Sequence, residues 1–214
     1  MKKIIIYGAG GFGREIACLI NSINTVAKEW NLIGFIDDGI KAGESNAFGK
    51  ILGNIDYINS YKEKVALVIP IASPKILRHI IGKLTNPNIW YPNLISPDVK
   101  FHDRGSFKCG KGNIVFSSCR ISCSVEIGDF NIMNSLVSLG HDVRLGNRNV
   151  LNPGARISGD CKIGNDNFFG VYAVALQGLK IGEETRVGAS SVVMRNTRDK
   201  SVYLGNPAKL IRFS

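Results

Sequence analysis

A six-residue period of apolar side chains runs through the second half of the chain. From Ile127 onward every sixth residue is apolar at twelve consecutive positions, and the same register extends backwards through Ile121, Val115 and Cys109. Hydrophobic residues make up only 44% of the chain, so chance does not account for such a series. The twelve positions are Ile127, Met133, Leu139, Leu145, Leu151, Ile157, Ile163, Phe169, Ala175, Ile181, Val187 and Val193.

A second period of eighteen residues is superimposed on the first. Pairs of an apolar residue or cysteine with glycine recur at this interval, from Cys109-Gly110 and Ile127-Gly128 to Ile181-Gly182. A helix has no period of six, and a flat sheet has no period of eighteen. A parallel β-helix has both, because each hexad forms one side of a triangular coil and three hexads close one turn. We therefore predict a β-helix over residues 106–195.

Two residues before the hexad positions, most side chains are small or of modest size, which suits a second inward row because side chains alternate along a strand. Cys119 and Cys161 fall in this row, and Cys109 falls on the hexad register itself. We predict that all three are small buried hydrophobic residues. A covalent acyl-cysteine intermediate is therefore disfavoured.

The first 90 residues follow a different pattern. Apolar strands are expected over residues 3–7, 32–36 and 64–69, and helices over 14–24 and from Ser73-Pro74 onward. Such alternation of strand and helix predicts a small parallel sheet, that is, a Rossmann-like α/β domain. Residues 91–105 contain Pro92 and Pro97 and are interpreted as a connector, and residues 196–214 as a C-terminal segment.

Charge and cysteine content narrow the class of protein. Lysine and arginine exceed aspartate and glutamate by ten, which suits anionic partners such as phosphorylated cofactors or nucleotide sugars. No apolar run reaches the length of a membrane-spanning helix, and the N-terminus does not have the pattern of a signal peptide. Five cysteines without zinc-ligand spacing predict reduced thiols, a cytoplasmic protein and no metal site. Nucleic-acid binding lacks a recognised motif.

The order of the two regions resembles a known family. Hexapeptide repeats that follow Gly8-Ala9-Gly10-Gly11-Phe12-Gly13 and end at Gly205-Asn206-Pro207-Ala208-Lys209 are similar to the sugar acetyltransferases of the left-handed β-helix superfamily. The closest groups act on amino-sugar nucleotides and on sialic acid. The resemblance implies a left-handed coil, a homotrimer, acetyl-CoA bound between neighbouring prisms, and a nucleotide sugar in the N-terminal domain.

His141 is the candidate general base. It lies two residues after the inward Leu139, at an expected corner, and Asp142 follows it. Imidazole has a suitable pKa for accepting the proton of an amine, and a carboxylate can orient it. From the residues alone, a solvent-exposed His-Asp pair is an equal alternative. The resemblance places Gly140-His141-Asp142 on the catalytic dyad of the family, with aspartate as its second member.

Further contacts follow from the same resemblance. The N–H of Gly159, one coil after His141, corresponds to the contact with the thioester oxygen, although a corner glycine kept for its conformation is the alternative. Other acetyl-CoA contacts correspond to Val150, Val171 and Ala189. Val150 stands where relatives can have histidine.

The glycine loop is the candidate nucleotide site. It follows a strand and opens a helix, so its amides could hold a diphosphate, although a structural turn is the alternative. A full NAD site is not expected, because the domain is too short for two mononucleotide-binding halves. Phe12 and Ser96-Pro97 depart from the family, in which histidine is frequent at the position of Phe12 and of Ser96. The corresponding substrate-binding residues are Gly10, Gly11, Phe12, Asp37, Asp38 and Gly53.

Three functions are compatible with these observations. The first is an acetyl-CoA-dependent N-acetyltransferase that acts on the 4-amino group of a nucleotide-linked sugar. O-acetylation of a sugar of the sialic acid type would use the same base on a hydroxyl group. A non-catalytic β-helix scaffold or nucleotide-binding module belongs to a different class. The glycine loop with Asp37-Asp38 favours a nucleotide sugar, because a free sugar needs no nucleotide site.

Overall fold

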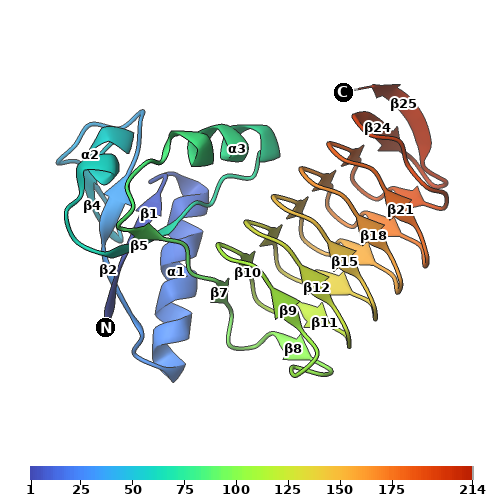
Figure 1. Ribbon diagram of the computed structural model, residues 1–214, viewed down its shortest axis with the longest axis horizontal. Helices are drawn as coiled ribbons and strands as arrows, with labels where there is room; N and C mark the ends of the chain where they lie inside the picture. Colours follow the sequence, from blue (N-terminus) through green and yellow to red (C-terminus); the bar gives the residue numbers. More distant parts are fainter. Residues whose placement is uncertain (214) are drawn as a thin grey trace. The chain divides into compact units, whose positions relative to one another are not determined.

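The computed structural model describes residues 1–213 and divides into two compact units, residues 1–97 and 98–214. Figure 1 shows the first unit as a sheet with flanking helices and the second as a stack of coils. Ser214, the last residue of the expected C-terminal segment, lies outside the described residues. No helix among the described residues is both long and apolar enough to cross a membrane.

The first unit is built on a largely parallel sheet. Its strands have the spatial order β3-β4-β2-β1-β5-β6, and only the β3–β4 pair is antiparallel. The strands of this sheet are β1 (Lys2–Tyr7), β2 (Trp30–Ile36), β3 (Ser45–Asn46), β4 (Gly49–Gly53), β5 (Val65–Val68) and β6 (Ile89–Trp90), and a further short strand, β7 (Leu94–Ile95), is not part of it. The helices are α1 (Gly11–Val26), α2 (Ile55–Ser60) and α3 (Pro74–Lys83).

The expected strands and helices are all present. Helix α1 buries Ile16, Leu19 and Ile20 on one face, as its apolar spacing predicts. The short elements β3, β4 and α2 were not predicted. Helix α2 begins because the side chain of Asn54 caps it and accepts from the N–H groups of Asp56 and Tyr57. Such local capping gives little apolar periodicity, so the sequence pattern does not reveal it.

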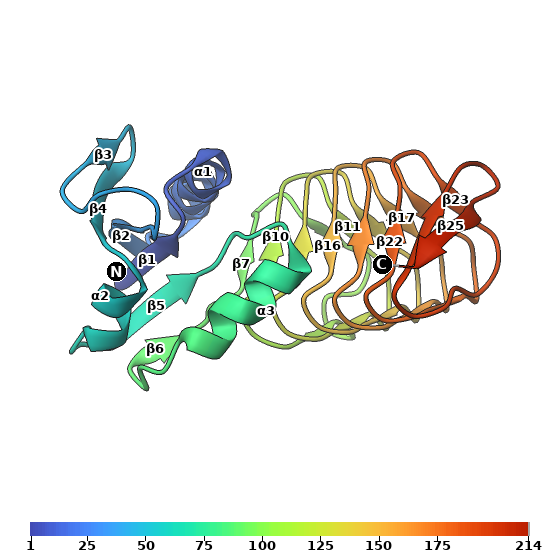
Figure 2. The same cartoon turned by 90° about the horizontal axis from the view of Figure 1, so that it is seen from above.

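The second unit has three sheets, one on each side of the coil. Figure 2 shows the stacked coils from above. The first side contains β10 (Ile114–Val115), β13 (Ile132–Met133), β16 (Val150–Leu151), β19 (Phe168–Phe169), β22 (Arg186–Val187), β24 (Ser201–Leu204) and β25 (Lys209–Phe213). The second side contains β8 (Lys100–Phe101), β11 (Arg120–Ile121), β14 (Ser138–Leu139), β17 (Arg156–Ile157), β20 (Val174–Ala175) and β23 (Val192–Val193). The third contains β9 (Lys108–Cys109), β12 (Glu126–Ile127), β15 (Arg144–Leu145), β18 (Lys162–Ile163) and β21 (Lys180–Ile181).

The register of the coils confirms the predicted periods. Strands pair in parallel with partners eighteen residues away, as in Leu139 with Ile157 and Ile127 with Leu145. All twelve hexad residues from Ile127 to Val193 are buried. From Cys119 to Ser191 the second inward row is buried as well, except for the half-buried Leu179. The predicted fold class, a Rossmann-like domain followed by a left-handed parallel β-helix, is confirmed.

The prediction that Cys109 is buried is wrong. Cys109 keeps its register opposite Ile127, but its side chain is exposed. Strand β9 is the edge strand of the third sheet, so no further coil covers this side of Cys109. Strand β8, which falls within the expected connector 91–105, pairs with β11 and therefore already belongs to the coil.

The last coil ends in a hairpin. Strand β24 pairs in parallel with β22, and β25 then turns back antiparallel to β24. The connecting residues contain the Gly205-Asn206-Pro207 sequence, in which the Asn206–Pro207 peptide bond is cis.

Candidate active site

His141 and Asp142 form a hydrogen-bonded pair at the corner that follows β14. The imidazole Nδ1 lies 2.8 Å from Asp142 Oδ2, and both side chains are about half exposed. Asp142 has a positive φ of 59°, a conformation that aspartate tolerates better than most residues. An ionised carboxylate only accepts hydrogen bonds, so we assign the proton of the neutral ring to Nδ1. Nε2 then carries the lone pair and is free to act as a base.

Gly159 lies against the reactive edge of this ring. Strands β14 and β17 are in register, and the N–H of Asp160 donates to the carbonyl of His141 at 2.8 Å. A Cβ atom added to Gly159 would overlap Nε2 and Cε1 of His141. The glycine therefore has a steric function, because no residue with a side chain fits here unless the imidazole moves.

At two corners of the prism the corresponding backbone N–H groups differ in whether a side chain caps them. We call Cys123, His141, Gly159, Gln177 and Arg195, which follow the second side of each coil, the histidine corner. The asparagine corner, formed by Lys111, Asp129, Asn147, Asn165 and Glu183, follows the third side. Three of its side chains cap the backbone N–H of the preceding coil. Asp129 accepts from Lys111 N, Asn147 from Asp129 N, and Asn165 from Asn147 N.

The N–H groups of His141 and Gly159 have no such cap. Within residues 1–213, neither N–H has a hydrogen-bond acceptor. Gly159 is nevertheless buried, because the imidazole of the preceding coil lies over it. A free N–H beside the basic nitrogen of a histidine is the donor that a developing oxyanion requires.

The three other expected acetyl-CoA contacts lie in different environments. Val171 and Ala189 are exposed on successive coils, at the corner between the first and second sides. Val150, on β16, is fully buried, so a ligand does not reach it in this structure. We therefore leave Val150 out of the proposed site.

An apolar patch borders the histidine corner. Tyr172, Leu176 and Met194 lie on the last coils, at the two corners that flank the second side. Each of these side chains is at least 40% exposed. Together with Val171 they form what we call the apolar patch. Exposed apolar residues that gather in this way often mark a binding surface.

The glycine loop connects β1 to α1. Gly10 and Gly11 are exposed, and a Cβ at either position would meet nothing, so an approaching ligand finds open space. No acidic residue lies in the first turn of α1, whose N-terminus therefore keeps its positive potential. A Cβ on Gly13 would overlap the carbonyl oxygen of Gly8, so Gly13 is required where the helix meets the strand. Phe12 is only partly exposed.

Asp37 and Asp38 hold the backbone around this loop. Asp37 accepts from the N–H groups of Ala9 and Gly39, each at 2.9 Å. Asp38 accepts from the N–H of Ile55 at 3.0 Å. The carbonyl of Gly53 accepts from the N–H of Asp37, and a Cβ on Gly53 would overlap Tyr57. The two carboxylates thus position the ends of neighbouring strands, which supports a structural function for them.

Tyr7 is a site residue that the sequence analysis missed. Its hydroxyl donates to Asp38 Oδ2 at 2.5 Å. Burial, and then this hydrogen bond, raise the pKa of Tyr7 above its usual range, so the hydroxyl keeps its proton. Its only signal in the sequence is its place at the end of a strand, immediately before the glycine loop.

The position of the loop agrees with how parallel sheets bind ligands. Strand β1 lies between β2 and β5, because the chain first adds β2, β3 and β4 on one side of β1 and then β5 and β6 on its other side. The strand order therefore reverses at β1. Ligands bind at the carboxyl ends of strands at such a switch point. The loop after β1 and the start of α3 after β5 both lie at this edge.

The cysteines do not form a reactive centre. None of the five forms a disulfide bond. Burial raises the pKa of Cys119 to about 12 and also raises the pKa of Cys161. A thiol with a raised pKa is a poor nucleophile. Among the described residues, no group of three or more His, Cys, Asp or Glu side chains is arranged to hold a metal ion.

Comparison with family models gives a match in the first unit. A family model described as the PglD N-terminal domain matches residues 3–84. A search of curated proteins gives no match.

Solved structures match almost the whole chain. The acetyltransferase domain of PglB from Neisseria gonorrhoeae, in complex with acetyl coenzyme A, is 26% identical, with a TM-score of 0.87 over 98% of this chain and 99% of that chain. WeeI from Acinetobacter baumannii is 25% identical, with a TM-score of 0.87 over 99% and 100% of the two chains.

A third match is PerB from Caulobacter crescentus, in complex with CoA and GDP-perosamine. It is 25% identical, with a TM-score of 0.86 over 99% of this chain and 98% of that chain. The predicted resemblance to hexapeptide-repeat sugar acetyltransferases is confirmed by these matches, and so is the enzyme class, acyltransferase.

Proposed function

We propose that this protein transfers the acetyl group of acetyl-CoA to the 4-amino group of a nucleotide-linked sugar. The observation that carries the proposal is the contact between His141 Nε2 and Gly159 at a corner where the backbone N–H is free. The PglB domain binds acetyl coenzyme A, and PerB binds CoA together with GDP-perosamine, which supports both substrates.

In this mechanism His141 is the general base. The amine nitrogen of the sugar attacks the thioester carbonyl, and Nε2 accepts the proton that the nitrogen loses. The new N–C bond forms as the C–S bond breaks, and CoA leaves as a thiolate that can take this proton from His141. Asp142 accepts from Nδ1–H at 2.8 Å, and so orients the ring and stabilises its protonated form.

Gly159 supplies the oxyanion donor. Negative charge develops on the thioester oxygen when the amine attacks, and a fixed N–H directed at this oxygen stabilises the transition state. The absence of a side chain lets the imidazole and the thioester approach the same backbone segment.

The N-terminal unit is the proposed site for the nucleotide. The N-terminus of α1, with Gly10, Gly11 and the backbone of Phe12, is suited to hold the diphosphate. Asp37 and Asp38 keep the loop in place through Ala9 and Tyr7, and their remaining lone pairs can accept from the nucleoside.

We also propose that the protein forms a homotrimer. Both side chains of the dyad are about half exposed, and a neighbouring prism would exclude water from them. The apolar patch on the coils that follow the dyad, which includes Tyr172 and Met194, would be buried by that neighbour, with Val171 and Ala189 lining the groove for acetyl-CoA. The reduced cysteines fit a cytoplasmic location.

The test is release of the CoA thiol with acetyl-CoA and a panel of acceptors. UDP-, GDP- and dTDP-linked 4-amino sugars and free sialic acid are compared for the wild type and His141→Asn. We expect turnover with a nucleotide amino sugar, which the variant loses. Turnover with sialic acid alone would assign O-acetylation instead. No turnover, and no rise of the melting temperature with acetyl-CoA, would indicate a scaffold.

A further inference from the structure

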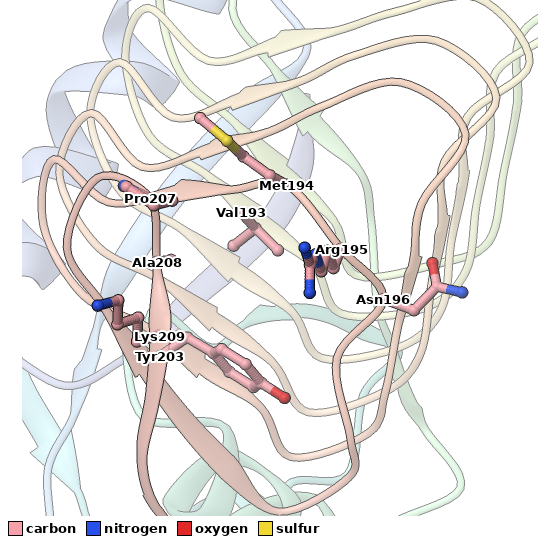
Figure 3. Close-up of a pocket in the computed structure, with 8 residues that line it drawn as sticks. All are labelled: Val193, Met194, Arg195, Asn196, Tyr203, Pro207, Ala208 and Lys209. Atoms are coloured by element: carbon pink, nitrogen blue, oxygen red, sulfur yellow. The ribbon is translucent and has the colours of Figure 1, made fainter.

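A cavity of about 480 Å³ lies in the first unit, beside the amino ends of β1 and β5. The residues that line it are Lys2, Lys3, Lys64 and Trp90. It is separate from the cavity in Figure 3, which lies in the second unit and is lined in part by Met194 of the apolar patch. A cavity of this size is large enough for a small-molecule ligand.

The register of the sheet brings the lining residues together. Ile4 of β1 pairs with Ala66 of β5, and Ala66 pairs with Trp90 of β6. Residues two apart along a strand share a face, so Lys2 and Lys64 lie on this face as well. Two ammonium groups and an indole ring are therefore placed on three neighbouring segments of the sheet.

Both tryptophans of the chain lie at this place. The ring centroids of Trp30 and Trp90 are 5.7 Å apart, and Trp30 is buried. Lys2 Nζ lies 5.4 Å from the centroid of Trp30 and 5.9 Å from that of Trp90. The buried partner ring holds Trp90 in position, and a positioned aromatic ring is a surface on which a planar base can stack.

The lysines of the cavity keep donors for an anion. Lys2 pairs with Glu29 at 2.9 Å and Lys3 with Glu63 at 2.5 Å, but no acidic residue lines the cavity. An ammonium group has three N–H donors, so one ion pair leaves two of them for a ligand. Lys64 has no ion-pair partner among the residues that the structure describes. Such a group of lysines suits a phosphate.

The cavity and the glycine loop are at opposite ends of β1. The strand has six residues, and a rise of about 3.3 Å per residue separates its two ends by about 17 Å. The loop follows Tyr7 at the carboxyl end, whereas Lys2 begins the strand. A diphosphate held by the loop therefore leaves the cavity open to a second ligand.

We propose that this cavity binds a nucleoside phosphate, with the lysine ammonium groups on the phosphates and the base against Trp90. The chemical class follows from the combination of groups. A simple phosphate does not need an indole ring, and an uncharged planar ligand does not need three lysines. The inference does not rest on the proposed acetyl transfer, because it concerns a different end of the sheet.

Intrinsic fluorescence tests the proposal, because both tryptophans of the chain are at the cavity. ATP, GTP and UTP are titrated into the full chain, in parallel with inorganic phosphate and the three nucleosides. We expect a saturable change with at least one nucleotide, and much weaker binding of phosphate and of the nucleosides, since each offers only one of the two contacts. Lys64→Gln should raise the Kd of that nucleotide about 10-fold, because a hydrogen bond between charged groups is lost.

Two further variants locate the ligand. Lys62→Gln is the matched control, since Lys62 is an exposed cation two residues from Lys64 that does not line the cavity, and it should keep the wild-type Kd. Gly11→Asp adds a negative charge to the glycine loop, where a Cβ meets nothing. It should weaken any binding of a nucleotide to the loop and leave the fluorescence response unchanged.

Four outcomes would overturn the proposal. The first is no fluorescence change with any of the three nucleotides, and the second is an equal Kd in the wild type and Lys64→Gln. The third is inorganic phosphate that binds as tightly as the nucleotides. The fourth is a response that Gly11→Asp abolishes, which would place the ligand at the glycine loop. The titration needs neither acetyl-CoA nor an acceptor, so its result is independent of the test of acetyl transfer.

Discussion

The histidine corner and the asparagine corner are built on the same backbone but differ in their side chains. At the asparagine corner, Asp129, Asn147 and Asn165 each accept from the N–H of the preceding coil. At the histidine corner the N–H groups of His141 and Gly159 have no acceptor within the described residues. In this repeating fold, a corner without a capping side chain therefore has a backbone N–H that is free to donate to a ligand.

A second ladder strengthens the asparagine corner. Asn113, Asn131 and Asn149 point inward and connect neighbouring coils, with Asn149 Nδ2 donating to Asn131 Oδ1 at 3.0 Å. The ladder is incomplete at Asn167, whose buried Nδ2 has no hydrogen-bond acceptor among the described residues. One corner thus supplies stability, whereas the other leaves polar groups available for chemistry.

The largest effect is expected when the base is removed. His141→Asn keeps a polar side chain of similar size but cannot accept the proton, so turnover should fall about 10²–10⁴-fold. Thiol release with the preferred acceptor measures it. Acetyl-CoA should still raise the melting temperature of the variant. Full activity in His141→Asn would refute the function assigned to this corner.

Gly159→Ala tests the close contact at the same corner. The added methyl group overlaps His141 Nε2, so the imidazole must move away from the free N–H. We expect kcat to fall about 10²–10³-fold, the range for loss of an oxyanion donor. Gly105→Ala is the matched control, because a Cβ there meets only ordinary contacts. Wild-type kcat in Gly159→Ala would contradict the proposed geometry.

Asn149→Ala should affect stability and not chemistry. The substitution removes a buried side chain that joins two coils and leaves the N–H of Asn167 without its acceptor. Unsatisfied buried groups cost about 1–3 kcal/mol each, so the free energy of unfolding should fall by a few kcal/mol. Denaturant unfolding measures this change, and kcat of the folded fraction should stay at the wild-type value.

Asn147→Ala should have the smallest effect. It uncaps the N–H of Asp129 at a partly exposed turn, so a loss of about 1 kcal/mol is expected by analogy with helix caps. Thermal unfolding detects it. If Asn147→Ala reduced kcat as strongly as Gly159→Ala, the two corners would not differ in function.

Much of the fold could be predicted from the sequence. The inward residues from Ile127 to Val193 repeat every six positions, and burial of this row requires the coil. The short elements β3 and α2 escaped prediction because local hydrogen bonds, such as those of Asn54, and not apolar periodicity, form them. Cys109 follows the period but is exposed, since the period does not say where the stack of coils ends.

The candidate site was predicted less completely. The sequence analysis placed His141, Asp142 and Gly159 at one corner, and the structure brings them together. It could not reveal that Val150 is fully buried, or that Tyr7 binds Asp38, because burial and side-chain contacts depend on segments far apart in the chain.

The sequence by itself determined the coil, its register and the stacking of His141 on Gly159, because a strict period of eighteen leaves one way to align successive turns. Only the tertiary structure decided which corners keep free N–H groups and that Cys109, at the start of the stack, stays exposed. Hydrogen-bond partners at a corner come from residues eighteen positions apart, and the last hairpin joins the coil only through the pairing of β24 with β22.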